Sequence, residues 1–179
     1  MTSTLADPST LVPYNQDNVL QVVIETPKAS RNKYAFDHDR RVFVLKKVLP
    51  AGMVFPYDFG FVPSTLAEDG DPIDVLVLMD EPAFPGCVLD ARLIGVIEGE
   101  DELEGGKTQR NDRVLAVASH SDTYENFRTE ADIPQQFLKH VEEFFVNYPR
   151  VLGGKVYRIL GCKGPDEAAK LIEGARKNA

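Results

Sequence analysis

Short apolar stretches separated by Pro- and Gly-containing turns run along most of the chain. They are rich in β-branched residues and have the length of strands. They lie at residues 19–25, 32–37, 42–45, 75–78, 88–97, 114–118 and 153–160. No stretch with helical periodicity occurs before residue 132. Because parallel strands need crossover helices, the pattern predicts an antiparallel sheet, closed into a small barrel that hides its edges.

Two amphipathic helices are predicted in the C-terminal part of the chain. Asp132 is a suitable N-cap for the first helix, and Pro149 is expected to end it. The apolar side chains of this helix share one face, and they are Phe137, Leu138, Val141, Phe144, Phe145 and Tyr148. The second helix begins at Pro165, and Arg176 and Lys177 in its last turn match the helix dipole. The fold class is therefore mainly β (α+β), a small β-barrel with two flanking C-terminal helices.

Composition places these elements in a single domain. The chain has 179 residues, 43% of them hydrophobic and 27% charged, as in ordinary globular domains. Residues 1–14 carry proline and small polar residues and predict a flexible N-terminal arm before a domain at 15–179. No apolar stretch approaches the roughly 20 residues of a membrane span. The first ten residues lack the basic start and apolar core of a secretory signal. Cys87 and Cys162 form no CxxC pair, and we expect a cytoplasmic protein that does not bind membranes.

The formal net charge is −8, which argues against general nucleic-acid binding. A phosphate ligand remains compatible with this charge if cations lie between it and the acidic side chains. The most specific acidic segment is EDGDPID at residues 68–74, where Asp69, Asp71 and Asp74 lie within six residues at the entrance to a strand. Such carboxylates repel one another unless a hard cation such as Mg²⁺ neutralises them. A solvated acidic turn is the alternative.

A second acidic run has five acids within residues 98–104. By itself it is typical of a water-facing loop, but it follows a strand of the same sheet, so Asp101 can face the first cluster. Glu25 ends an otherwise apolar strand and is a third candidate. The basic residues on or beside strands are Lys33, Lys47, Arg113 and Lys155. Carboxylates and basic groups in one cleft suit phosphoryl chemistry, although each residue alone is more often a surface charge.

Other chemistries find no support. The sequence contains neither GxSxG nor a Walker A segment, and its histidines lack the spacing of metal ligands.

Residues 68–75 (EDGDPIDV) resemble the signature of the soluble family I inorganic pyrophosphatases. The resemblance continues through VVIETP around Glu25, NKYAFD around Lys33, residues 55–78, NDRVLAVA, and EEFFVNY before GGKVY. It covers roughly residues 15–172. The resemblance implies a closed β-barrel of the OB type, hydrolysis of inorganic diphosphate to two phosphates, and Mg²⁺ as cofactor. Bacterial members are typically hexamers, so a homo-oligomer is also implied.

Carried over by position, the resemblance also implies roles for single residues. Asp69, Asp74 and Asp101 resemble metal ligands, and Asp71 resembles the carboxylate that binds and deprotonates the attacking water. Glu25 resembles a supporting acid. The positions of expected substrate contacts are Lys33, Lys47, Arg113 and Tyr148.

Several positions depart from the family pattern. Ala35 stands in place of a Glu, Phe55 and Phe59 in place of Tyr, and Pro149 in place of a Lys, while Lys47 and Arg113 exchange the usual Arg and Lys. Two alternatives therefore stay open, namely a non-catalytic relative that binds metal and phosphate, and a hydrolase of organic diphosphates.

The last departure concerns a metal ligand, because Asn111 aligns with a metal-binding Asp of the family. On an extended strand Asn111 and Arg113 would point together and Asp112 away, unless a bulge turns Asp112 inward. We expect Asp112 to be the ligand, because a carboxylate binds Mg²⁺ better than an amide does.

Overall fold

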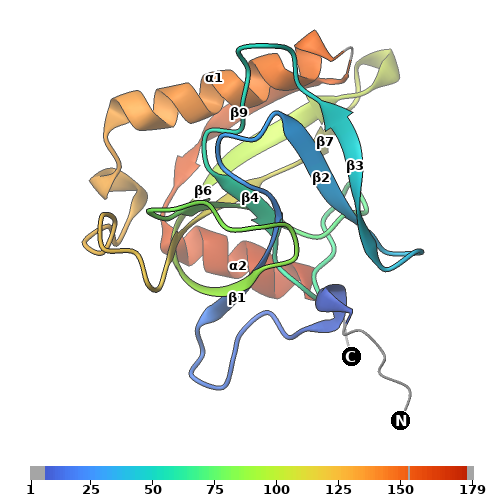
Figure 1. Cartoon of the computed structure of the whole chain (residues 1–179). Coiled ribbons are helices and arrows are strands. Elements are labelled where there is room, and N and C mark those ends of the chain that lie inside the picture. The colour runs from blue at the N-terminus through green and yellow to red at the C-terminus, as the bar shows by residue number, and fades with distance from the viewer. Residues whose placement is uncertain (1–6, 153, 177–179) are drawn as a thin grey trace.

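The computed structural model describes residues 7–152 and 154–176, and it is mainly β with two C-terminal helices (Figure 1). The main sheet consists of β1 (Leu20–Thr26), β4 (Asp58–Phe61), β5 (Asp74–Leu78), β6 (Val88–Glu102), β7 (Thr108–Arg110), β8 (Arg113–Ala118) and β9 (Val156–Lys163). A separate hairpin consists of β2 (Asn32–Asp37) and β3 (Val42–Val48). The helices are α1 (Gln135–Val151) and α2 (Pro165–Ala175), with short 3-10 turns η1 (Pro8–Thr10), η2 (Glu104–Gly106) and η3 (Glu130–Asp132).

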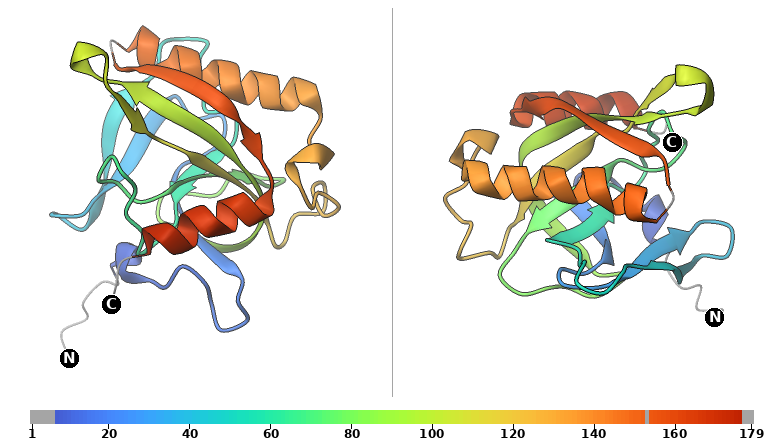
Figure 2. Two further views of the ribbon diagram at one scale, coloured as in Figure 1. Left: turned by 180° about the vertical axis from the view of Figure 1, so that it is seen from behind. Right: turned by 90° about the horizontal axis from the view of Figure 1, so that it is seen from above.

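Strand pairing in the main sheet runs round a ring. β1 pairs with β4, β4 with β5, β5 with β8, β8 with β6, and β6 again with β1. The sheet is strongly twisted and ring-like, as the views in Figure 2 show. The expected fold class, an OB-like β domain with two C-terminal helices, is confirmed.

The expectation of a wholly antiparallel sheet is wrong at one place, because β5 and β8 are parallel. Parallel neighbours need a long connection, but that connection need not be a helix. Here β6 and β7 form the connection from β5 to β8, and β6 pairs antiparallel with β8.

Both faces of the parallel pair are buried, which explains its nearly continuous apolar sequence. Val75 and Val114 pack in a core under α2, whereas Leu76 and Leu115 pack in a core under α1. The two helices therefore cover opposite faces of the sheet (Figures 1 and 2). Within the described residues, no helix is long and apolar enough to cross a membrane.

Two short strands and the far end of β6 escape prediction from the sequence. β4 has four residues, and Gly60 lets it approach β1 so closely that a Cβ there would overlap the Val23 carbonyl oxygen. The acidic run of residues 98–104, read as a possible loop, continues β6 as far as Glu102. It stays extended because it pairs with β7 on one side and β9 on the other.

The helix boundaries differ slightly from expectation. Asp132 does not cap α1 but is the last residue of η3, where its carboxylate accepts the Thr129 N–H; α1 begins three residues later, with Pro134 at its N-cap. Pro149 does not end α1 but lies in its last turn, which ends at Val151. Arg176 lies just after α2, and Lys177 falls outside the described residues.

The segment expected as an arm is described from residue 7 onward. Its backbone hydrogen-bonds to the domain, since Ser64 N donates to Ser9 O and Gln21 N to Pro13 O. Residues 1–6 lie outside the described part of the chain.

Candidate active site

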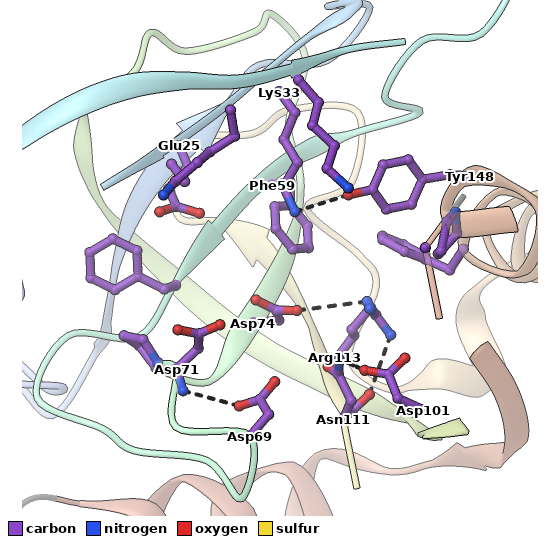
Figure 3. A pocket seen from close by; sticks show the side chains of 18 of the residues that line it. Glu25, Lys33, Phe59, Asp69, Asp71, Asp74, Asp101, Asn111, Arg113 and Tyr148 are labelled. Atoms are coloured by element: carbon purple, nitrogen blue, oxygen red, sulfur yellow. Dashed lines mark hydrogen bonds and ion pairs between the residues drawn. The ribbon is translucent and has the colours of Figure 1, made fainter. Parts of the chain in front are cut away.

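A cleft of about 520 Å³ opens between the β2–β3 hairpin, the start of β5 and β8, and the C-terminal end of α1. Both acidic and basic side chains line it, with Lys33 and Tyr148 on the far side from Asp69 and Asp71, and Arg113 beside Asp74 (Figure 3). The cleft brings together every site residue expected from the sequence except Asp112: Glu25, Lys33, Lys47, Asp69, Asp71, Asp74, Asp101, Arg113 and Tyr148. Lys155, Ala35, Phe55, Phe59 and Pro149 also line it.

The parallel pair positions the centre of the cleft. Asp74 and Arg113 begin β5 and β8 and are direct partners in the register. Because side chains alternate along a strand, both share a face with Leu76 and Leu115, the face covered by α1. Arg113 Nε lies 3.8 Å from Asp74 Oδ2.

The same alternation corrects the expected orientation of Asp112. Its carboxylate turns away from the cleft, accepts the Gly99 N–H at 2.9 Å and pairs with Arg110 at 2.8 Å. Asn111 lines the cleft instead, and its amide donates to Asp101 Oδ2 at 2.9 Å. The expected bulge before Asp112 is absent between β6 and β7, where Glu100 pairs with Arg110 in regular register.

The acidic loop before β5 has a defined turn. Asp69 Oδ1 accepts the backbone N–H of Asp71 at 3.1 Å, and Gly70 between them has φ 91°. A positive φ is costly for residues with a Cβ, so glycine suits this position. The turn presents Asp69 and the exposed Asp71 to the cleft mouth, below Asp74 (Figure 3).

Burial and mutual repulsion disfavour the charged form of these acids. Burial raises the pKa of Asp74 to about 6, although Arg113 and Lys33 oppose the shift. Burial raises the pKa of Glu25 to about 7, against the Phe36 N–H that its carboxylate accepts at 2.7 Å. The pKa of Asp69 is also raised, by burial and by the neighbouring Asp71 and Asp101. A cation in the cleft would therefore stabilise the ionised acids.

The donor set fits a hard, partly hydrated cation. Oxygen donors come from Asp69, Asp71, Asp74, Asp101 and the Asn111 amide. Within residues 7–152 and 154–176, no three His, Cys, Asp or Glu side chains lie close enough together to enclose an ion by themselves. This arrangement suits Mg²⁺, which keeps several waters and is bound through few carboxylates together with substrate phosphates.

Lys33 and the Tyr148 hydroxyl lie across the cleft from Asp69 and Asp71 (Figure 3). Lys33 Nζ donates to Tyr148 Oη at 3.0 Å and lies 5.9 Å from the centre of the Phe59 ring. Burial lowers the pKa of Lys33, but Tyr148, Asp74 and Glu25 together raise it, and the net shift is upward. Lys33 is therefore held as a cation above the acids (Figure 3).

One cleft residue, Lys46, was not expected from the sequence. Lys33 pairs with Lys47 and Tyr34 with Leu45, so Lys46 is the extra residue of a β-bulge. The bulge allows the neighbouring side chains of Lys46 and Lys47 both to line the cleft. Strict alternation would have placed them on opposite faces, and no sequence pattern marks the bulge.

Comparisons with known proteins agree with this geometry. The sequence model of the family described as "Inorganic pyrophosphatase" matches residues 22–179. The chain is 42% identical over 160 residues to an inorganic pyrophosphatase of Synechocystis sp., covering 89% of this chain and 91% of that protein. It is 41% identical over 159 residues to the Nostoc sp. protein of the same name, covering 89% and 90% of the two chains.

Solved structures resemble it over nearly the whole chain. The crystal structure of an inorganic pyrophosphatase from Thermus thermophilus has a TM-score of 0.86 and 32% sequence identity, covering 95% of this chain and 97% of that one. A second, from Neisseria gonorrhoeae, has a TM-score of 0.82 and 31% identity, covering 92% and 94%.

An OB-like sheet whose cleft sets carboxylates against lysine and arginine defines a hydrolase that acts on phosphate compounds. With the family model matched over most of its length, the chain belongs to the inorganic pyrophosphatase family.

Proposed function

We propose that this protein hydrolyses inorganic diphosphate to two phosphates with Mg²⁺ as cofactor. The observation that carries the proposal is one cleft lined by several carboxylates together with lysine and arginine side chains. The basic side chains can bind an anionic substrate. The carboxylates repel one another and require cations, which can also bind the substrate oxygens.

Asp69, Asp74 and Asp101 are the residues proposed to hold Mg²⁺, with the Asn111 amide as a neutral donor beside Asp101. Asn111 replaces Asp112 in this role because it is Asn111 that lines the cleft. When bound, Mg²⁺ acidifies water and neutralises charge on the departing phosphate.

Asp71 is proposed as the general base. Its carboxylate is exposed at the cleft mouth between Asp69 and Asp74, and its side chain accepts no hydrogen bond from the described residues, so it is free to take the proton of the attacking water. The water oxygen forms the new P–O bond while the bond to the bridging oxygen breaks.

Lys33, Lys47, Arg113 and Tyr148 are proposed to bind the phosphate oxygens. Glu25 supports this arrangement, because the hydrogen bond from Phe36 N to its carboxylate ties β2, which carries Lys33, to the end of β1. This hydrogen bond holds the β2–β3 hairpin against β1.

Phosphate release from diphosphate and from ATP, each with and without Mg²⁺, tests the proposal. Release from diphosphate only, and only with Mg²⁺, is expected. Release from ATP at a similar rate would favour the hydrolase of organic diphosphates, and no release from either would favour the non-catalytic relative.

We further propose a homo-oligomer, a hexamer by family resemblance, in the cytoplasm. Exposed apolar side chains support the assembly, since Val146 and Val151 of α1 and Val156 and Leu160 of β9 are 36–54% exposed. Light scattering coupled to size exclusion measures the assembly size.

A further inference from the structure

We propose that Tyr157 is a positioning residue that acts through Arg113, holding the guanidinium so that it binds phosphate instead of forming a two-bond pair with Asp74. This inference rests on the proposed function, because it assigns the arrangement behind one of the phosphate-binding groups. The sequence analysis assigns no role to Tyr157, which ends the GGKVY segment and lies on β9.

The guanidinium of Arg113 lies between two aromatic rings. Its Cζ atom is 4.0 Å from the centre of the Tyr157 ring and 4.4 Å from that of Phe145. The three residues are 6%, 1% and 2% exposed, respectively. A guanidinium stacks favourably on aromatic faces, most strongly where water is excluded. Rings from β9 and α1 thus fix the plane of a side chain that begins β8.

Tyr157 also fixes the rotation of the guanidinium within that plane. The Asn111 carbonyl accepts both the Tyr157 hydroxyl at 3.0 Å and Arg113 Nη1 at 3.3 Å. Among the described residues, Arg113 donates no other side-chain hydrogen bond, and Nε is buried without a partner in hydrogen-bonding range. A guanidinium has five N–H donors, so its remaining Nη donors are left for a ligand in the cleft.

Asp74 is the competing partner. Its carboxylate lies 3.8 Å from Arg113 Nε, outside hydrogen-bond distance, and a small rotation of a free arginine would form a two-bond pair with it. Such a pair would occupy the arginine donors and also a proposed Mg²⁺ ligand. Keeping Arg113 between the rings therefore leaves its donors available to phosphate and the Asp74 carboxylate available to Mg²⁺.

Gly99 of the neighbouring strand β6 leaves space for the Tyr157 side chain. A Cβ at Gly99 would overlap the Tyr157 hydroxyl and ring. The buried glycine between Glu98 and Glu100 thus makes room for the tyrosine, whose direct partner on β6 is Asp101.

A double-mutant cycle tests the inference. The variants are Tyr157→Leu, Arg113→Lys and the double variant, together with Tyr157→Phe, which keeps the ring but loses the hydroxyl. We expect Tyr157→Leu to lower kcat/KM for diphosphate about 30-fold, the size of a desolvated cation–π interaction, mainly by raising KM. Tyr157→Phe is expected to stay within about threefold of the wild type, as for one neutral hydrogen bond. In the Arg113→Lys background, Tyr157→Leu is expected to lower kcat/KM by a further factor of less than about two, because the guanidinium that Tyr157 positions is absent.

Two controls separate positioning from general damage to the fold. Tyr124→Leu removes an aromatic residue that packs on Phe127, outside the cleft, and should leave kcat/KM unchanged. Phe145→Leu removes the opposite ring and should show the same coupling to Arg113, which keeps the test decisive if Tyr157→Leu does not fold.

The affinity for inorganic phosphate, measured by calorimetry in the same variants, tests the inference independently of turnover. Equal losses from Tyr157→Leu in both backgrounds, in kcat/KM or in phosphate affinity, would overturn it. A wild type that binds phosphate but releases none from diphosphate would instead contradict the proposed function.

Discussion

Replacing Asp112 by alanine should weaken the fold while leaving the Mg²⁺ requirement of activity unchanged. The structure places this carboxylate on the face of the strand opposite the cleft, where it accepts the Gly99 N–H and pairs with Arg110. Replacing Asn111 by alanine should have the opposite signature, because its amide lies inside the cleft against Asp101.

The size of the effect follows from the two interactions lost. Gly99 is buried, and leaving its N–H without an acceptor costs about 1–3 kcal/mol. The ion pair adds less than about 1 kcal/mol, because the Arg110 side chain is 36% exposed. A total near 2 kcal/mol lowers the Tm by about 4–8 °C in a chain of this size.

Thermal melts of the metal-free variants and Mg²⁺ titrations of phosphate release measure the two quantities separately. For Asp112→Ala we expect the lower Tm with an unchanged half-saturating Mg²⁺ concentration. For Asn111→Ala we expect a higher half-saturating concentration with little change in Tm. If Asp112→Ala raises the Mg²⁺ requirement and keeps the Tm, the orientation argued from strand alternation is refuted.

Three further outcomes are expected. Asp71→Asn should lower kcat/KM by about 10²- to 10⁴-fold with an unchanged Tm, since asparagine keeps the shape but accepts no proton; near-normal phosphate release would refute the base assignment. Ca²⁺ in place of Mg²⁺ should compete for the cleft without supporting turnover, because it is larger and less demanding in geometry; equal rates in the two metals would contradict this. The raised pKa of Glu25, about 7 against 4.5, means that the folded metal-free protein takes up a proton that the unfolded chain does not hold. Its stabilising contribution is complete below about pH 4.5 and disappears as the pH rises through about 7. Melts of metal-free protein should therefore show a fall in Tm between pH 5 and pH 8, reduced in Glu25→Gln; a flat profile would show that Glu25 is ionised throughout.

Among the elements predictable from the sequence, those with complete burial have the clearest pattern. β5 and β8 stand out because both of their faces are buried, so apolar residues follow one another without a break. β4 does not stand out, because four residues with a glycine carry too little pattern for its close contact with β1 to be foreseen. The parallel pairing escaped because a β crossover replaces the expected helix.

The candidate site was predictable wherever chemistry is concentrated in a short segment. The three acids of residues 69–74 are so close in sequence that they repel one another unless a cation lies between them. A shared position in a cleft could therefore be expected. The orientation of Asp112 was not predicted, because the preference for a carboxylate ligand conflicted with strand alternation, and the side chain follows alternation. Tyr157 and Lys46 escaped for a different reason, since a stacking contact and a β-bulge depend on partners distant in sequence.

The parallel register of Asp74 with Arg113 also has a consequence for the order in which the chain acquires its cleft. The two residues meet only after the whole β6–β7 crossover has been laid down, and the β6–β9 pairing requires residues as late as 163. Contacts between such distant segments form slowly compared with local ones. During synthesis, the acidic turn of residues 69–74 therefore emerges after Lys33 and Lys47 but long before Arg113. A nascent chain that ends before β9 lacks Tyr157, one of the two rings that hold Arg113. We therefore expect the chain to bind phosphate only after β9 has been synthesised.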